Sequence, residues 1–124
     1  YGYKFKNENN EVAGYSILKN KKNALIMDIG PSPEKKFSND YQAGALSFEI
    51  ISGDKKLICN SGYFQDYKHQ LNDLSKSTAS QSTLIIDNQS SCKIRKQGNN
   101  YSKIEQGLKT TKKSIFHGDA IVNK

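Results

Sequence analysis

The chain has 124 residues, enough for one domain with one core, and its 19 Lys and Arg residues outnumber 12 Asp and Glu, giving a net charge of +7. No apolar run approaches the roughly 18–20 residues that cross a bilayer, so no membrane partner is expected. Nearly all the positive charge is lysine, because Arg95 is the only arginine. The excess of positive charge indicates either a solvated surface or attraction to an acidic partner, such as an anionic polysaccharide or a nucleic acid.

The ends of the chain suggest a piece of a longer protein. It begins with Tyr1 rather than Met, and it stops shortly after the apolar Val122. We expect a single domain over residues 1–124 with truncated ends. No signal peptide is visible, which in a fragment says nothing about export.

The first third of the chain predicts a hairpin. Two short apolar runs, residues 15–19 and 24–29, are joined by the polar residues 20–23, which is typical of two strands and a charged turn. The sequence Gly-Pro-Ser-Pro at residues 30–33 then breaks the chain. Residues 34–40 are polar and predict a loop.

Residues 41–62 predict a second hairpin. Leu46, Phe48 and Ile50 alternate with polar residues, the period of two that puts one face of a strand on a core. The chain turns at residues 52–54 and returns through the apolar residues 57–59.

The second half has a long polar connection and then several short strands. Residues 63–80 are polar, with one helical turn expected at residues 70–75. A strand over residues 82–87 would place Leu84 and Ile86 on one face. Further strands are expected at residues 91–96, 101–105, 108–115 and 118–122. About eight short strands separated by turns predict an all-β fold, an antiparallel two-sheet sandwich of jelly-roll type.

No catalytic constellation or nucleic-acid motif is evident. His69 sits in a polar loop and is expected to be solvated, whereas His117 is either a ligand or base or a structural residue at a strand end. Cys59 and Cys92 lie in apolar runs outside any CxxC motif, so we expect two buried free thiols. A nucleic-acid partner is not expected, because the aromatic and basic residues do not form a recognisable binding octet.

Several motifs together resemble heparinase II/III-like proteins. YQAGALSFE at residues 41–49, followed by LICNSG at 57–62, resembles their "HAG-x-LSFE … VNCG" hairpin. KSTASQSTL at residues 76–84 resembles "R-x-T-A-A-H-S-T-L", and ALIMDIG at 24–30 resembles a strand ending in "DAG". His117-Gly118 is similar to a later "H-x-G-Y" stretch. The order and spacing of these motifs agree with those of the family over roughly residues 15–120.

The resemblance implies the C-terminal β-sandwich domain of a polysaccharide lyase-like protein. In that family an α/α-toroid domain of the same chain precedes the sandwich, and the two close around an acidic polysaccharide. The main catalytic residues lie on the helical domain, so catalytic residues of this chain are unknown and the chain alone is expected to be inactive. The resemblance also implies a periplasmic or secreted location, with a cytoplasmic one left open.

The family's zinc ligands can be carried over one by one. The histidine of "HAG" falls on Gln42, the aspartate of the returning strand on Asn60, and the histidine of "AHST" on Gln81. Neutral amides are poor zinc ligands, so we predict no metal and no other cofactor. Asp40 occupies the place of the family's sandwich histidine near the cleft.

The three amides could still have a role. They could hydrogen-bond to one another where the metal would sit, or the loops could have drifted apart. With Tyr41 and His117, these amides are the candidate substrate-binding residues. Two functions remain open: a sandwich domain that completes a cleft for acidic glycans, with β-elimination in the full protein, or a non-catalytic carbohydrate-binding or structural sandwich.

Overall fold

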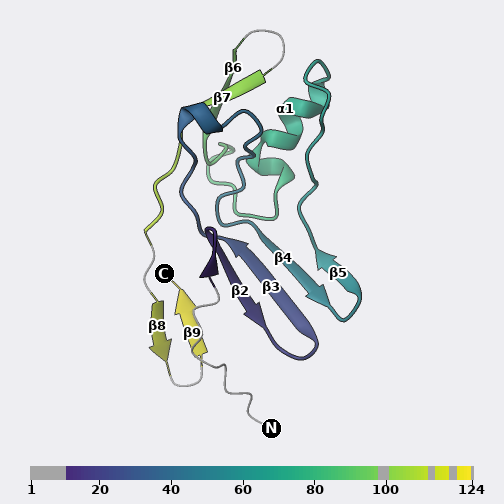
Figure 1. Ribbon diagram of the computed structural model, residues 1–124, viewed down its shortest axis with the longest axis vertical. Helices are drawn as coiled ribbons and strands as arrows, with labels where there is room; N and C mark the ends of the chain where they lie inside the picture. The colour runs from purple at the N-terminus through teal and green to yellow at the C-terminus, as the bar shows by residue number, and fades with distance from the viewer. Residues whose placement is uncertain (1–10, 98–100, 112–113, 118–119, 124) are drawn as a thin grey trace.

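The computed structural model describes residues 11–97, 101–111, 114–117 and 120–123 (Figure 1). Within these residues the regular structure is mainly antiparallel β, with one short α-helix. The predicted all-β antiparallel sandwich class is therefore confirmed. No helix in the described part of the chain is long and apolar enough to cross a membrane.

The larger sheet has five antiparallel strands in sequence order. They are β1 (Glu11–Val12), β2 (Tyr15–Lys19), β3 (Asn23–Asp28), β4 (Phe48–Ser52) and β5 (Lys55–Ile58). The turn between β2 and β3 is closed by Asn20, whose Oδ1 accepts hydrogen bonds from the backbone N–H groups of Lys22 and Asn23. Asn favours such turns because its side chain bonds to the backbone two residues on. Both predicted hairpins are confirmed.

Two further hairpins complete the described strands. They are β6 (Lys93–Gln97) with β7 (Tyr101–Gln106), and β8 (Ser114–His117) with β9 (Ala120–Asn123). Short helices lie at Lys35–Phe37 (3₁₀), Gln70–Lys76 (α1) and Thr78–Ser80 (3₁₀). In Figure 1, α1 and the β6–β7 hairpin occupy one end of the molecule and strands β2–β5 the other.

Helix α1 forms where the sequence predicted a helical turn at residues 70–75. His69 caps it, because its Nδ1 accepts a hydrogen bond of 3.1 Å from the backbone N–H of Leu71. The His69 side chain is exposed as predicted, but its ring also lies 5.1 Å from that of Phe64. At the other end, Ser77 Oγ donates to the carbonyl of Leu74 at 2.7 Å. Such caps satisfy backbone groups that a helix of only two turns leaves unpaired.

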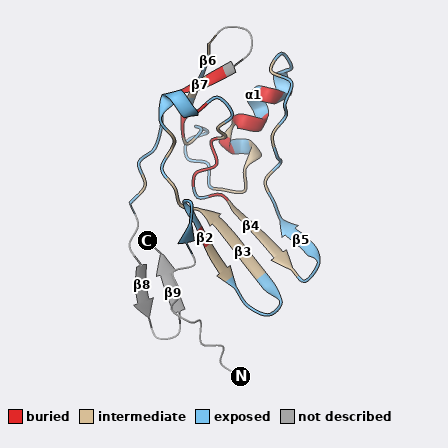
Figure 2. Cartoon of the chain, in the orientation of Figure 1, coloured by how far each residue is buried: buried red, intermediate tan, exposed pale blue. Residues whose placement is uncertain are grey.

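The most buried residues gather near α1 rather than on the larger sheet. Figure 2 shows the buried segments around α1 and β7, whereas β2, β3 and β4 are of mostly intermediate exposure. The apolar core is small and consists of Ala43, Cys92 and Ile104, with Tyr41 and Ile94 packed against it. Because this core joins the 41–43 segment to β6 and β7, it fixes the loops that form the candidate site.

The predicted strand over residues 82–87 is wrong. This segment has only an isolated bridge between Ile86 and Gln89, and Leu84 is 77% exposed. Ile86 is also mostly exposed. The alternating apolar residues lack a neighbouring strand, because the backbone of the segment bonds through Ser82 to Phe48 instead. Asp87 and Asn88 then take positive φ angles and turn the chain.

The prediction that Leu46 lies on the core face of a strand is also wrong. Its φ angle is +60° and its side chain is 55% exposed, so β4 begins only at Phe48. The predicted strand over 108–115 is wrong over residues 108–111, which are irregular; residues 112–113 lie outside the described ones, and the strand is present from Ser114. The predicted strands over 101–105 and 118–122 correspond to β7 and β9, although residues 118–119 lie outside the described ones.

Both cysteines are free, as predicted, but only one is buried. Cys92 is buried, and this burial raises the pKa of its thiol to about 11, so it is a poor nucleophile. Cys59 is exposed, so its predicted burial is wrong. It follows the last residue of β5, an edge strand of the larger sheet.

Candidate functional site

The candidate site is organised around the buried residue Ala43. Its side chain is completely buried, and its backbone N–H donates to the carbonyl of Lys76 at 2.8 Å. Its carbonyl accepts from Thr78 Oγ1 at 2.7 Å and from Ser91 Oγ at 3.0 Å. A small residue with a fully bonded backbone cannot shift easily. The neighbouring residue Gln42 is therefore held close to the segment that follows α1.

A tight turn follows, and it connects this segment to the end of β3. The N–H of Ser47 donates to the carbonyl of Gly44 at 2.9 Å, and Leu46 donates to the carbonyl of Asp28 at 3.0 Å. The N–H of Asp28 donates in return to the carbonyl of Ser47 at 2.8 Å. A Cβ atom at Gly44 would lie 3.1 Å from Ser47 Oγ, so a side chain there would crowd the turn.

Two of the predicted amides bond directly to each other. Gln81 Nε2 donates to Gln42 Oε1 at 3.2 Å and to the carbonyl of Ser75 at 2.9 Å. The predicted hydrogen bonding between amides at the family's metal position is therefore confirmed for Gln42 and Gln81. Their contact joins two segments that are 39 residues apart in the sequence.

The third amide, Asn60, bonds to serine residues instead. Its Oδ1 accepts from both the N–H and the Oγ of Ser82 at 2.8 Å, and its Nδ2 donates to Ser47 Oγ at 3.4 Å. The carbonyl of Phe48 is an alternative acceptor for the single hydroxyl proton of Ser82. Asn60 thus ties the end of the second hairpin to the residue that follows Gln81, but the expectation of a bond to the other amides is wrong.

These side chains line one pocket of about 290 Å³, which we call the amide pocket. Its lining consists of Tyr15, Asp28, Asp40, Tyr41, Gln42, Gly44, Ser47, Asn60 and Gln81. Four of the five candidate residues named from the sequence are thus brought together. The fifth is His117, whose backbone lies in β8. The side chain of His117 lies outside the described part of the structure.

The charge of the amide pocket is negative. Its described lining contains Asp28 and Asp40 and no lysine, arginine or histidine. Burial raises the pKa of Asp28, against the lowering effect of the hydrogen bond that its Oδ1 accepts from the N–H of Gly30 at 3.0 Å. Burial also raises the pKa of Tyr41, so this phenol is neutral at physiological pH.

Asp40 is held by two phenols. Its Oδ1 accepts hydrogen bonds of 3.0 Å from the hydroxyls of Tyr63 and Tyr67. Desolvation, together with the hydrogen bonds to Tyr67 and Asp40, raises the pKa of Tyr63 to about 12. The two tyrosine hydroxyls therefore orient the carboxylate of Asp40, which occupies the position where the resemblance implies a histidine.

Sequence reasoning did not assign Tyr15, Asp28, Gly44 and Ser47 to the site. Tyr15 lies opposite Asp28 in the register of β2 and β3. The short turn over residues 20–23 fixes that register, so the pairing of these two residues could have been predicted. Ser47 had no such signal, because it reaches the pocket through the positive φ angle of Leu46.

The residues at the family's metal position do not fit zinc. Three neutral amides supply neither the imidazole nor the carboxylate donors that zinc prefers, and the amide oxygens of Gln42 and Asn60 already accept hydrogen bonds from Gln81 and Ser82. Within the described residues, no group of three or more His, Cys, Asp and Glu could hold a metal ion. The absence of zinc from the protein stays a prediction.

The fold and the pocket define an antiparallel β-sandwich domain whose polar site is built from loops at the end of the larger sheet. The family described as "Heparinase II/III-like, C-terminal" matches residues 7–122, and the chain belongs to this family. The resemblance noted in the sequence is thereby confirmed. Neither a search of curated proteins nor a search of solved structures gives a match.

Proposed function

We propose that this domain forms one wall of a glycan-binding cleft in a polysaccharide lyase-related protein. The observation that carries the proposal is the grouping of Gln42, Asn60 and Gln81 with Tyr15 and Tyr41 in the amide pocket. Amides both donate and accept hydrogen bonds, as sugar hydroxyls do. Tyrosine adds an apolar ring with a polar tip. An α/α-toroid domain of the same chain would form the opposite wall.

The proposed ligand is an acidic polysaccharide. The net charge of +7 attracts such a polymer at long range, while the amide pocket itself, with two carboxylates, suits the hydroxyl groups of a sugar ring. The acidic groups of the glycan would then contact other surfaces of the protein. A polysaccharide partner of this kind agrees with a periplasmic or secreted location, which cell fractionation would test.

In the full protein the proposed chemistry is β-elimination. A base removes the proton beside a uronate carboxylate, the bond from C4 to the leaving sugar oxygen breaks, and a double bond forms between C4 and C5. Within the described residues we assign no base to this reaction. The contribution of this domain is to bind and orient the sugar, while the toroid domain would supply the base.

A non-catalytic carbohydrate-binding or structural role is the second candidate. The replacement of three metal ligands by amides favours it. Incubating the full-length protein with uronate-containing polysaccharides separates the two functions, because a lyase leaves an unsaturated uronate that absorbs ultraviolet light. Binding without this product would favour the second candidate.

Calorimetric titration with a uronate-containing oligosaccharide tests the binding role itself. The double variant Q42A/Q81A should bind about tenfold more weakly, the value of one to two hydrogen bonds in a desolvated site. The control variant Q65A removes an amide from an exposed loop and should bind like the wild type. Equal affinities of Q42A/Q81A and Q65A would contradict the proposal.

A further inference from the structure

A second pocket, of about 630 Å³, lies between α1, β6 and β7. We call it the lysine pocket, because Lys76, Lys93 and Lys96 line it beside a single acidic residue, Asp73. Three lysines and one aspartate give this lining two net positive charges, whereas the amide pocket has two carboxylates and no cation in its described lining. The two pockets therefore select for different chemical groups.

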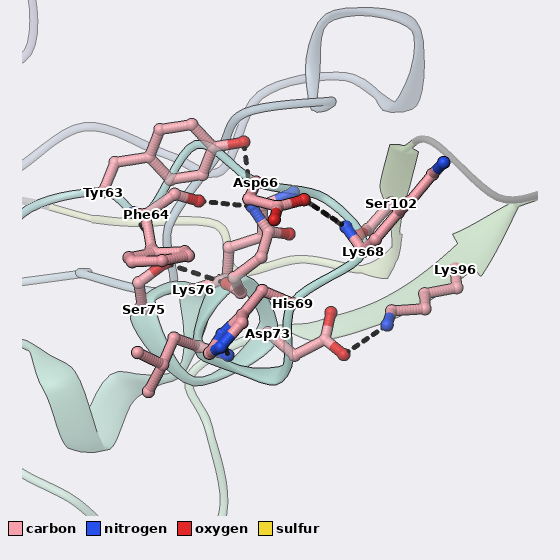
Figure 3. A network of polar contacts seen from close by, with 12 residues as sticks. Tyr63, Phe64, Asp66, Lys68, His69, Asp73, Ser75, Lys76, Lys96 and Ser102 are labelled. Carbon is pink, nitrogen blue, oxygen red and sulfur yellow. Dashed lines mark hydrogen bonds and ion pairs between the residues drawn. The ribbon is translucent and has the colours of Figure 1, made fainter.

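Lys76 is the most deeply buried of the three lysines. It is 2% exposed, and its Nζ donates to the carbonyl of Asn39 at 2.8 Å and to Ser102 Oγ at 3.4 Å. The Nζ also lies 5.5 Å from the ring centroid of Tyr63 and 5.6 Å from that of Tyr67. Figure 3 labels Lys76, Tyr63 and Ser102 of this cluster. These direct partners are neutral groups, and the charge of the ammonium is offset only in part by electrostatic interaction with the carboxylates of Asp40 and Asp73.

Lys93 and Lys96 lie at the more exposed side of the pocket. Lys96 Nζ is 2.6 Å from Asp73 Oδ2 (Figure 3). Lys93 Nζ is 3.2 Å from Glu105 Oε2, but Arg95 contacts the other oxygen of the same carboxylate at 2.9 Å. One carboxylate thus serves two cations, which leaves a positive excess. The lysine side chains are 65% and 53% exposed, so both can turn toward a ligand.

Hydroxyl groups complete the lining. Four serines line this pocket: the hydroxyls of Ser77 and Ser91 already donate to backbone carbonyls, whereas those of Ser90 and Ser102 accept hydrogen bonds and keep a proton to donate. A hydroxyl can donate a hydrogen bond to an anionic oxygen, and an ammonium group donates up to three. Hydrogen bonds in which the donor or the acceptor is ionised are stronger than those between two neutral groups.

We propose that the lysine pocket is a binding site for an oxyanion group, a carboxylate, sulfate or phosphate, carried by a ligand of sugar size. The volume of the pocket exceeds what a single ion fills, and its charge and hydroxyls match an acidic saccharide. The proposal does not rest on the proposed function, because the two pockets share no lining residue.

The test is a titration of the ¹⁵N-labelled protein with a uronate disaccharide, and separately with inorganic phosphate and with inorganic sulfate, at low and high salt. Backbone amide signals of residues 89–93 and 76–77 should shift. The double variant K93Q/K96Q should bind about tenfold more weakly, since each lost charge contact at a partly exposed site changes affinity by a few-fold. K93Q leaves Glu105 paired with Arg95, so the fold should be retained.

The matched control is K55Q/K56Q, which removes the same charge from the exposed start of strand β5. A loss of affinity in the control equal to that in K93Q/K96Q would overturn the proposal, as would the absence of shifts at residues 89–93 with all three probes. Tighter binding of the disaccharide than of phosphate and sulfate would identify a saccharide ligand. Equal binding of all three would support the site with a free ion as its ligand. Q42A/Q81A should bind phosphate and sulfate like the wild type and should keep the disaccharide-induced shifts of residues 89–93, even though its binding at the amide pocket is weakened, which separates this test from that of the proposed function.

Discussion

The amide pocket and the lysine pocket both adjoin residues bonded to one buried segment, but they differ in charge. Ala43 connects them, because its carbonyl accepts from Thr78 and Ser91, and Ser91 lines the lysine pocket while the adjacent Gln42 and Gly44 line the amide pocket. The positive charge of the chain is therefore unevenly placed. A net charge of +7 does not make every pocket attractive to an anion, because the described lining of the amide pocket has two carboxylates and no cation.

The difference in charge between the two pockets depends most on Lys76, the buried lysine of the lysine pocket. Replacing it with alanine would remove a buried side chain and its hydrogen bonds to Asn39 and Ser102, and we expect a loss of about 2–4 kcal/mol in the free energy of unfolding. The measurement is urea denaturation followed by circular dichroism.

The variant K76M separates volume from charge at this position. Methionine retains most of the volume and removes the cost of burying an ammonium group, so its stability should lie much closer to that of the wild type. If K76M is as unstable as K76A, the charge of Lys76 stabilises the fold. The expectation that its volume dominates would then be wrong.

Thr78 offers a way to disturb both pockets at once. It is 1% exposed, and its Oγ1 donates to the carbonyl of Ala43 and accepts from the N–H of Ser91 at 2.8 Å. The isosteric variant T78V leaves the N–H of Ser91 without this acceptor, which should cost about 1–3 kcal/mol of unfolding free energy. Thermal or urea unfolding would measure this loss.

T78V should also weaken ligand binding at both pockets, whereas K93Q/K96Q should affect only one. The control T83V removes a hydroxyl that donates to Ala45 outside the lysine pocket lining. If T78V weakened binding at one pocket and left the other at wild-type affinity, the buried segment would not couple the two sites.

The fold was predictable from the sequence where the signals were local. Asn20 and the neighbouring lysines marked the turn of the first hairpin, and Gly53 marked the turn of the second. The strand expected over residues 82–87 failed because apolar alternation does not supply a partner strand. The prediction that Leu46 lies on the core face of a strand was wrong because a positive φ angle in a non-glycine residue has no simple sequence signal.

The two pockets also differ in how far the sequence predicts them. The proximity of Gln42 and Gln81 was expected from motif resemblance, and their hydrogen bond agrees with that expectation. The lysine pocket had no such signal, because Lys76 lies in a polar segment and Ser102 lies 26 residues further along. A lysine in that setting is expected to be exposed, and only tertiary packing shows that it is buried.

The smallest expected effect concerns Asp28, one of the two carboxylates that make the amide pocket negative. Its folded-state pKa is raised above the ordinary 3.8 by burial, so the folded protein retains this proton more readily than the unfolded chain does. Ionisation of Asp28 therefore costs stability as the pH rises from 3.8 through the folded-state pKa, and the full cost is present above it.

The variant D28N cannot ionise, and its Oδ1 can still accept from the N–H of Gly30. At neutral pH we expect D28N to be more stable than the wild type by at most about 1 kcal/mol, since the site is partly solvated. The difference should shrink toward zero in acid, and urea midpoints measured across the acidic range would show this. D54N, in the exposed turn between β4 and β5, is the control for the loss of a carboxylate charge as such. D28N should also bind a uronate oligosaccharide more tightly than the wild type. Unchanged affinity would mean that the carboxylates of the amide pocket do not set its preference for neutral groups.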